Sequence, residues 1–525
     1  MQRKVDVAIL GGGLAGNLLA RQLRRELPDL SVSIYERHVE RSYKVGESTV
    51  EVASHYLLRR QQLGTYLHKN HLPKHGLRYF FDNEACDGDI RTMSEIGPKW
   101  PAAYPSFQLD RARLERDLLE MNAADGVEVN LGARVTDVEV SDDLDAPHTF
   151  TVVTDGERTK VSARWVIDAG GREGIVAKLK DLRVPEKKHR IAAGWGRFTG
   201  VGDIDGIRDA DAFHRRVNYV SRVLSTNHFM SEGQWIWFIP LREGITSLGI
   251  VQDASMWDAK KSKVDGFMQA IRKHKAVREL TEDVECLDYM SFTQLAFRTK
   301  RFFGTTRWAC IGDAAAFTDP FYSPGSDFIS LENDLVSDLI RRDVEGDGYA
   351  DAVDVYDGYM QYRLDSTMVI YEGLYKTFGS YELYRAKLYF DTGLYYNVLF
   401  DPYWNDKHRD LRWVRSELRR KEFSMQFLEN FRQLFLGVAG EIKKRGDYFR
   451  KNTGHYTNDA VEAYGLFLTV GEPRSRAEIR EQNERLFAET KRRLGEILGD
   501  EGALAKLFND ENRELYDAWS QLAAT

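Results

Sequence analysis

The chain has little of three things: cysteine, long apolar runs and excess positive charge. Its three cysteines, Cys86, Cys286 and Cys310, show neither pairing nor metal-ligand spacing, which excludes a disulfide scaffold, predicts no metal site and favours a reducing, cytoplasmic location. No apolar run approaches the roughly 20 residues that cross a bilayer, so we expect no membrane span and no signal peptide. The net charge of −7 argues against nucleic acid or an anionic membrane as a partner.

A glycine-rich turn near the N-terminus is the strongest motif that is present. The apolar run Val5–Leu10 predicts a buried parallel strand, and the helical run Leu14–Leu27 follows the turn. Between them the glycines are spaced as G-x-G-x-x-G, which permits a tight turn, close backbone approach to a pyrophosphate, and close packing of helix on strand. The free N–H groups of the helix N-terminus then face the phosphates. The cofactor-binding residues predicted here are Gly11, Gly13, Leu14, Ala15 and Gly16.

An acidic residue ends the next predicted strand. Glu36 follows the run Ser31–Tyr35, twenty residues after Gly16, and its carboxylate can accept hydrogen bonds from both ribose hydroxyls. A phosphate on that ribose would meet the negative charge, so FAD or NAD is favoured over NADP. We include the adjacent Arg37 among the cofactor-binding residues.

A second signature lies some 300 residues further along the chain. The predicted strand Trp308–Ile311 ends at Gly312-Asp313, and a helix is expected to begin near Gly325. Asp313 can bond the ribityl hydroxyls, and the N–H groups at the helix start can face the pyrimidine edge of a flavin. Two such turns far apart suit one long dinucleotide, which favours FAD over NAD. The cofactor-binding residues predicted here are Gly312, Asp313, Pro320, Gly325 and Ser326.

A polar loop and a charged helix complete the predicted cofactor site. The loop Tyr43–Thr49 is expected to pass across the flavin, with Ser48 and Thr49 at the cofactor and one of them capping the helix that follows. Arg111, at the start of the amphipathic helix Asp110–Leu119, can reach the pyrophosphate. A solvated helix face explains the arginine equally well.

The order of patterns predicts an α/β fold with a helical C-terminal region. At 525 residues, 42% hydrophobic and 30% charged, the chain can form two or three folded domains. We expect a Rossmann-like FAD-binding domain that is interrupted by a β-sheet substrate domain and followed by helices that cover the substrate side. The predicted segments are 1–185 (first part of the FAD domain), 186–300 (substrate domain), 301–345 (return segment) and 346–525 (helical domain).

One strand of the β-rich region carries two tryptophans. Strict alternation places Trp235, Trp237 and Ile239 on one face, and Pro240 ends or bends the strand. A core strand with bulky residues is the plain alternative. The tyrosines that crowd the C-terminal helices are likewise more often core residues than substrate-stacking ones.

Together these stretches resemble the flavin-dependent halogenases, the tryptophan-halogenase-like branch of the FAD monooxygenase superfamily. The resemblance covers roughly residues 1–345 and rests on the Gly11–Gly16 turn with Glu36, the Lys44–Ser48 loop, the Trp235–Pro240 strand and the Gly312–Gly325 segment. The tryptophan–x–tryptophan–x–isoleucine–proline signature is the most telling, because the family is commonly recognised by it.

The resemblance implies a reaction and assigns further residues to it. In the family, reduced FAD from a separate reductase reacts with O2 to give a flavin hydroperoxide, halide attacks it, and hypohalous acid travels through a tunnel to an aromatic substrate. A lysine lines that tunnel, and Lys74, after the turn expected at Pro73, sits at the matching place; without the resemblance it is typical of a surface lysine. The residues implied beside it are Ser323 as a second catalytic residue, Gly325 for chloride or bromide, and Trp235, Trp237, Ile239, Pro240 and Tyr322 for the substrate or tunnel.

Two departures from the family pattern shape the functional prediction. Tyr322 stands where tryptophan halogenases have a glutamate, which points to a phenol- or pyrrole-type substrate, free or tethered to a carrier. Pro324 has no N–H in the turn that holds halide in the family, so hydroxylation without halide is the alternative. With no second nicotinamide fingerprint, reduced flavin is expected from a partner reductase. Because the glycines and Asp313 are intact, a flavin-binding protein without turnover is disfavoured.

Overall fold

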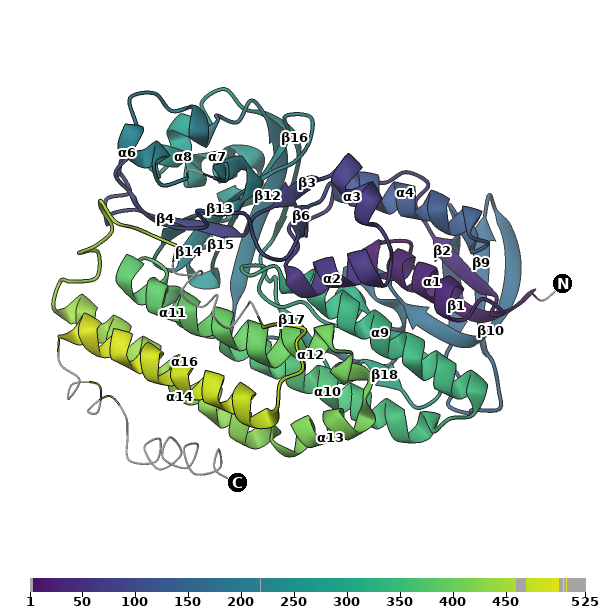
Figure 1. Cartoon of the computed structure of the whole chain (residues 1–525). Helices are drawn as coiled ribbons and strands as arrows, with labels where there is room; N and C mark the ends of the chain where they lie inside the picture. Colours follow the sequence, from purple (N-terminus) through teal and green to yellow (C-terminus); the bar gives the residue numbers. More distant parts are fainter. Residues whose placement is uncertain (1–2, 218, 459–468, 500–503, 505–506, 508–525) are drawn as a thin grey trace.

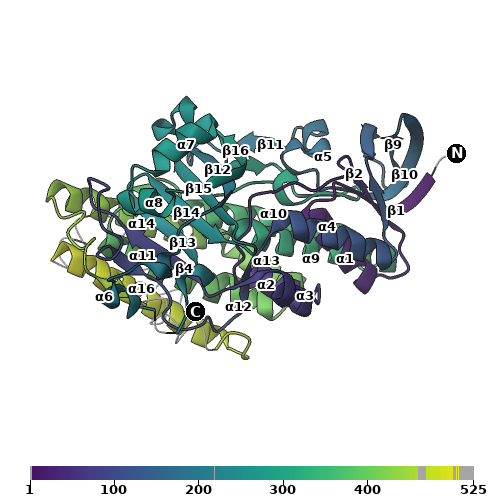
Figure 2. The ribbon, with the colours of Figure 1, turned by 90° about the horizontal axis from the view of Figure 1, so that it is seen from above.

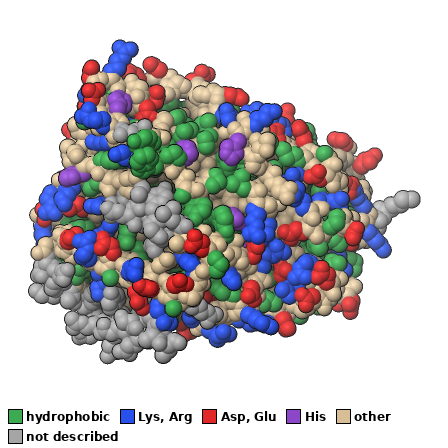
Figure 3. Space-filling view, in the orientation of Figure 1, with side chains coloured by type: hydrophobic (Ala, Val, Ile, Leu, Met, Phe, Trp, Pro, Cys, Tyr) green, Lys and Arg blue, Asp and Glu red, His purple; other side chains and the backbone are tan. Residues whose placement is uncertain are grey.

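Two eight-stranded sheets and a helical layer form the protein (Figure 1). The computed structural model describes residues 3–217, 219–458, 469–499, 504 and 507. Figures 1 and 2 both place the N-terminal end of the first sheet at one end of the molecule and helices α14 (Lys421–Lys444) and α16 (Arg476–Leu498) at the other. On the face shown in Figure 3, acidic and basic side chains intermingle over most of the surface.

The first sheet is the nucleotide-binding sheet that the N-terminal motif predicts. Its central strand pairs in parallel on both sides, with Ile9 opposite Ile34 and Ile167. Parallel strands of this kind are covered on both faces, so their sequences are mostly apolar. The strand Val32–Glu36, for example, is buried at every residue. In sheet order the strands are β18 (Phe303–Gly304), β19 (Trp308–Cys310), β10 (Glu157–Asp168), β1 (Arg3–Leu10), β2 (Val32–Glu36) and β7 (Glu128–Leu131), with β8 (Arg134–Glu139) and β9 (His148–Thr154) added antiparallel beside β10.

Three helices pack together beside this sheet, and the first of them follows the glycine turn. Helix α1 (Leu14–Glu26) contacts both α4 (Arg111–Ala124) and α9 (Pro324–Glu345). Asp110 caps α4, because its carboxylate accepts the N–H of Arg113 at 3.0 Å. The shorter helices here are α2 (Glu51–Arg59), α3 (Gly64–Asn70) and α5 (Ile175–Leu179).

Two local predictions in this region are wrong. The N-cap of α2 is Val50, and neither Ser48 nor Thr49 caps the helix, because their hydroxyls are taken up by tertiary contacts. Pro73 does not make a turn. It lies within the short strand β3 (Leu72–Lys74), which pairs antiparallel with β6 (Ser106–Gln108).

The second sheet comes mostly from the predicted β-rich segment, with β4 (Leu77–Phe81), β5 (Ser94–Ile96) and β20 (Tyr456–Thr457) added from elsewhere in the chain. One of its faces packs in a core of its own, and the other belongs to the core that it shares with the nucleotide sheet. Alternate residues of β14 (Gln234–Pro240) divide between two cores: Ile236 and Phe238 pack on one side, Trp235, Trp237 and Ile239 on the other. In sheet order the strands are β16 (Glu285–Phe292), β12 (Ile191–Thr199), β15 (Thr246–Asp253), β14, β13 (Thr226–Ser231), β4, β5 and β20. Helices α6 (Asp211–His214), α7 (Val264–Ile271) and α8 (Lys275–Leu280) lie beside it, and β11 (Arg183–Pro185) pairs with β17 (Phe297–Thr299).

The C-terminal part is helical, as predicted, apart from the short strand β20 and as far as its residues are described. A turn of π-helix, η8 (Tyr395–Phe400), interrupts the helical run, a feature that is frequent at functional sites. Residues 459–468 and most positions after 499 lie outside the described chain, so the helical prediction is untested there. The helices are α10 (Tyr349–Val369), α11 (Tyr381–Leu394), α12 (Asp401–Trp404), α13 (Leu411–Arg419), α14 and α16.

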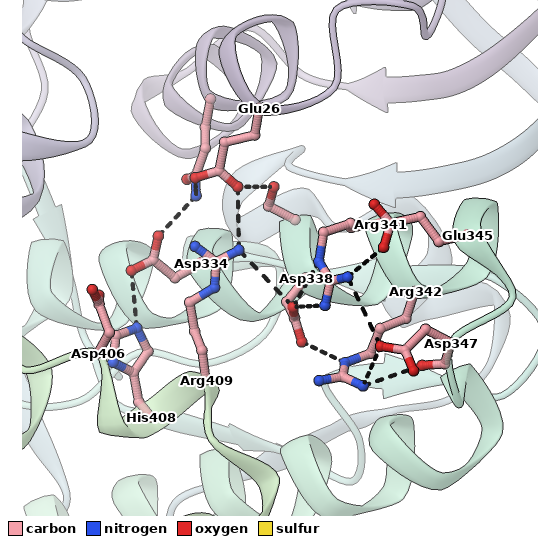
Figure 4. Close-up of polar contacts among 12 residues, drawn as sticks. Glu26, Asp334, Asp338, Arg341, Arg342, Glu345, Asp347, Asp406, His408 and Arg409 are labelled. Atoms are coloured by element: carbon pink, nitrogen blue, oxygen red, sulfur yellow. Dashed lines mark hydrogen bonds and ion pairs between the residues drawn. The ribbon is translucent and has the colours of Figure 1, made fainter.

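A buried polar network joins this helical part to the nucleotide sheet (Figure 4). Asp334 of α9 accepts hydrogen bonds from His408 at 2.9 Å and from Arg60 at 3.1 Å. Although burial opposes it, the bond to His408 holds the pKa of Asp334 well below its usual value. Glu26 of α1 pairs with Arg409 at 3.3 Å, which fastens the helical part to the first helix of the fold.

The predicted architecture, a nucleotide fold interrupted by a β-sheet segment and followed by helices, is confirmed. The exact domain boundaries remain predictions. No helix among the described residues is both long enough and apolar enough to cross a membrane.

Candidate functional site

A cleft of about 980 Å³ lies over the carboxyl ends of the central strands. We call it the dinucleotide cleft. It is lined by both glycine turns and by the two-tryptophan strand, and the two turns lie more than 300 residues apart in the sequence. The predicted residues that line it are Gly11, Gly13, Leu14, Ala15, Glu36, Arg37, Ser48, Arg111, Trp235, Trp237, Ile239, Gly312, Asp313, Pro320, Ser323, Gly325 and Ser326.

The three glycines of the first turn serve different purposes. Gly11 has φ +118°, and a Cβ there would lie 2.4 Å from the carbonyl oxygen of Ala169. A Cβ on Gly16 would lie 2.2 Å from the carbonyl oxygen of Gly11, so Gly16 permits packing and does not face the cleft. A Cβ on Gly13 would have only the Lys44 ammonium within 4 Å, at 3.8 Å, and would project into free space. Gly13 therefore leaves room for a ligand.

The carboxylate of Glu36 is held in place by groups of the protein itself. Its carboxylate accepts the N–H groups of Gly12 and His38, both at 2.8 Å, and pairs with Arg41 at 3.3 Å. Although burial opposes it, the N–H of His38 and the guanidinium of Arg41 lower the pKa of Glu36 below its usual value. The charge that was expected to exclude a 2′-phosphate is thus present at neutral pH. Arg37, in contrast, pairs with Glu173 at the surface.

Two cationic side chains line the cleft close to the first glycine turn. Lys44 pairs with Glu115 at 2.8 Å, and Arg111 pairs with the same carboxylate and donates to the carbonyl oxygen of Val45 at 2.9 Å. The resemblance included the loop that contains Lys44 but gave this lysine no role. Its position in that loop, four residues before Ser48, was the signal that could have placed it at the cleft.

The second signature, at Gly312 and Asp313, also lines the cleft. The N–H of Gly312 donates to buried Glu332 of α9 at 2.5 Å, which holds the turn against that helix. Burial raises the pKa of Asp313 above its usual value. Ser323 adopts φ +58°, and Pro324 is the first residue of α9, a position where a missing N–H breaks no helical bond.

The two tryptophans are held by side-chain hydrogen bonds of their indole N–H groups. Trp235 donates to the hydroxyl of Tyr375 at 2.8 Å, and that hydroxyl donates to buried Asp319 at 2.6 Å. Trp237 donates to the hydroxyl of Ser247 at 3.1 Å. Both rings therefore have fixed orientations at the edge of the cleft. Sequence reasoning missed Tyr375, because it lies 140 residues from Trp235.

A second, smaller cavity of about 280 Å³ contains Lys74. We call it the Lys74 cavity. Tyr322 lines it as well, together with Tyr362 of α10 and with Tyr395 and Tyr396 of η8. Three predicted positions line neither cavity: Gly16, Thr49 and Pro240.

Lys74 is buried, which overturns the surface reading that its sequence context favours. Its side chain is 1% exposed, and its ammonium donates to the hydroxyl of Ser48 at 2.8 Å and to the carbonyl oxygen of Thr49 at 2.7 Å. Ser48 lines the dinucleotide cleft, so this hydrogen bond connects the two cavities. Burial lowers the pKa of Lys74 to about 8, although Glu51 and Asp327 oppose the shift.

Asp327 is a functional candidate that the sequence prediction did not include. It lines the Lys74 cavity from the first turn of α9, and its carboxyl accepts the N–H of Ala53 at 2.8 Å and the hydroxyl of Tyr395 at 3.0 Å. Burial raises its pKa to about 8. The available signal was an acidic residue in the first turn of the helix after Gly325, which is also a common stabilising feature of helices.

The structure also brings together Asp82, Cys86 and His274, whose ligand atoms lie within 4.8 Å of one another. His274 bonds Asp82 at 2.9 Å. Although burial opposes it, this bond raises the pKa of His274 to about 9. The trio is therefore explained as a buried ion pair with a neighbouring thiol.

Comparisons with known proteins agree with this geometry. The FAD binding domain family model matches residues 4–327. The chain is 28% identical over 436 residues to the flavin-dependent halogenase chlA of Dictyostelium discoideum, covering 77% of this chain and 71% of that protein. It is 24% identical over 337 residues to a 1H-pyrrole-2-carbonyl peptidyl-carrier-protein chlorinase of Pseudomonas fluorescens, covering 61% of this chain and 72% of that protein.

A solved structure shares the fold. The crystal structure of halogenase PltM in complex with phloroglucinol and FAD matches with a TM-score of 0.66 and 15% identity, over 93% of this chain and 96% of that chain. The chain belongs to the FAD binding domain family. The predicted resemblance to the flavin-dependent halogenases is confirmed by these relatives, and the likeness to PltM shows the shared fold.

Proposed function

We propose that this protein halogenates an electron-rich aromatic ring of the phenol or pyrrole type, using reduced FAD, O2 and chloride or bromide. The position of Lys74 is the observation that carries the proposal. The buried ammonium lies 2.8 Å from a hydroxyl of the dinucleotide cleft and lines a second cavity large enough for a small aromatic ring. A hypohalous acid that reaches Lys74 can accept a hydrogen bond from it or form a haloamine.

The residues of the cleft fit FAD. Gly13 leaves the pyrophosphate position open, Glu36 is placed for the ribose, and the N-terminus of α1 has no side-chain cap, so its N–H groups are available to phosphate. When bound, reduced FAD supplies the activation of O2 and the oxidation of halide. The chain's own contribution is to bind and orient the flavin with Trp235 and Trp237 at its edge, and to supply the Lys74 ammonium beyond it.

We infer that a separate reductase supplies the reduced flavin, because the sequence has a single dinucleotide fingerprint. The acceptor is a small aromatic compound, free or attached to a carrier. The chlorinase of P. fluorescens, by its name, acts on a pyrrole held by a peptidyl carrier protein, and PltM was crystallised with phloroglucinol. Both support an electron-rich ring as the acceptor.

The proposal is tested by incubating the protein with a flavin reductase, bromide or chloride, and a panel of phenols and pyrroles. We expect products with the isotope pattern of bromine or chlorine in mass spectra. Oxidised products that lack halogen with both halides would contradict it.

Hydroxylation is the second candidate function, favoured by Pro324. The missing N–H removes one donor from the turn of Ser323 and Gly325, both of which line the cleft and are proposed to hold halide and oxidant there. This candidate requires turnover in halide-free buffer. Strict dependence of product formation on halide would exclude it.

Asp327 makes the stability of the protein depend on pH in a defined window. Between about pH 4 and pH 8 the native state keeps a proton on Asp327 that the unfolded chain has released, so the free energy of unfolding falls as pH rises through this window. The slope from one such group is at most about 1.4 kcal/mol per pH unit. Asp327→Asn should remove this contribution, as measured by urea unfolding of variant and wild type at several pH values from 5 to 8.

The exposed Asp351, in the first turn of α10, provides the matched control for that measurement. Asp351→Asn leaves Asp327 in place and should retain the fall in the free energy of unfolding that wild type shows across this window. If Asp327→Asn shifts stability by the same amount across the window, the carboxyl is ionised in the native state and the inferred proton is absent.

A further inference from the structure

The Lys74 cavity contains an arginine that is buried without a carboxylate. Arg363, from the C-terminal half of α10, is 5% exposed and lines this cavity. Its Nη1 donates to the carbonyl oxygen of Val398 at 3.2 Å, and its Nε has no hydrogen-bond partner. The guanidinium carbon lies 4.3 Å from the ring centre of Tyr362 and 5.3 Å from that of Tyr359.

Arg363 differs in this respect from the other buried arginines. Within the described chain, no Asp or Glu lies within ion-pair distance of it, and Glu417 interacts with it only through its charge at longer range. The four other arginines of comparable burial each have such a partner: Arg78 with Glu95, Arg197 with Asp288, Arg222 with Glu95, and Arg493 with Glu489. An unpaired charge is expensive to bury, and cation–π contacts with two tyrosines offset only part of that cost.

Three carboxyl groups also line the cavity, and two of them lie near Lys74. Glu51 and Asp327 line the cavity and interact electrostatically with Lys74. Asp391, also in the lining, pairs with Lys387 and accepts the hydroxyl of Tyr322 at 2.7 Å. The carboxylate of Glu51 beside Lys74 disfavours an anionic group there, whereas the charge of Arg363 on the helical layer attracts one.

We propose that Arg363 binds a carboxylate of the aromatic acceptor, so that the acceptor is an aromatic acid whose ring faces Lys74. A guanidinium is a planar fork that matches a carboxylate, and burial strengthens the pairing. Its Nη1 is engaged with backbone and its Nε is fully buried without a partner, so the second Nη is the group left to bond a ligand carboxylate. The inference rests on the proposed function for the fate of the ring but not for the binding of the anion.

The test compares two probes of equal size, 3,5-dihydroxybenzoate and 3,5-dihydroxybenzamide, by calorimetric titration of the FAD-loaded protein. Wild type should bind the carboxylate at least about tenfold more tightly than the amide. Arg363→Met should lose this preference while binding the amide as wild type does. The control Arg415→Met, at an exposed arginine of α13, should keep it. Arg363→Lys retains the charge and should retain part of the preference, which keeps the test valid if the methionine variant fails to fold.

Three results would overturn the inference. One is equal binding of the two probes, or binding of neither, by wild type. Another is that Arg363→Met prefers the carboxylate as strongly as wild type does. If that variant does not fold, the corresponding result is that wild type and Arg363→Lys both prefer the amide. The third is displacement of the carboxylate by equimolar bromide, because Arg363 would then be a halide site. Since the readout is binding, a protein that prefers the carboxylate but forms no halogenated product contradicts the proposed function alone.

Discussion

Replacing Lys74 with alanine is expected to abolish halogenation while leaving flavin binding and flavin reoxidation intact. The ammonium is the one cation that both lines the Lys74 cavity and bonds a residue of the dinucleotide cleft, among the residues that the structure describes. Removing a buried donor of this kind typically lowers turnover by about 10²- to 10³-fold. The measurement is halogenated product per flavin oxidised, by mass spectrometry and by absorbance of the same reaction.

Two companion variants make the result specific. Lys69→Ala removes an exposed lysine of α3 and should leave the yield unchanged. Lys74→Met keeps the length of the side chain and should match the alanine variant, because the charge and the N–H groups are what is lost. Full product yield from Lys74→Met would show that the lysine only fills space.

Gly13→Asp is expected to prevent FAD binding without harming the fold. Gly13 is the N-cap of α1 with φ −79°, a position that Asp and Asn favour, so the apoprotein should unfold at or above the wild-type temperature. An added side chain projects into the open part of the cleft that we assign to the pyrophosphate. Like charges about 4 Å apart repel by about 4 kcal/mol at an effective dielectric constant of about 20. The measurement is FAD titration, followed by quenching of flavin fluorescence.

Gly13→Asn separates charge from bulk in this experiment. It is nearly isosteric with the aspartate variant and caps the helix equally well. We expect FAD to bind at least about tenfold more weakly to Gly13→Asp than to Gly13→Asn. Equal affinities would mean that the pyrophosphate lies elsewhere.

Much of the dinucleotide cleft could be predicted from the sequence, because its parts are local. A strand, three glycines and a helix specify one turn geometry over a dozen contiguous residues, and Gly11 and Gly16 have the close contacts that the spacing implies. Alternation along a strand likewise sufficed for Trp235, Trp237 and Ile239, which share one face of β14.

The predicted cap of α2 failed for the opposite reason. Ser48 and Thr49 are good capping residues, but their hydroxyls bind distant groups: Ser48 contacts Lys74 and Thr226, and Thr49 accepts the N–H of Phe107. Hydrogen bonds to residues distant in the sequence therefore replace the local bond to the start of α2.

The sequence by itself determined the glycine turn between strand and helix and the order of nucleotide sheet, second sheet and helices, and it predicted a dinucleotide without a 2′-phosphate. Only the tertiary structure decided which charged side chains face the Lys74 cavity. Lys74, Asp327 and Arg363 come from segments that are 36 to 289 residues apart, and nothing in the immediate context of any of them distinguishes it from a surface residue. Burial is a property of the packed chain. It lowers the pKa of Lys74 and raises that of Asp327, and it encloses Arg363 at a place where no carboxylate lies within ion-pair distance among the described residues.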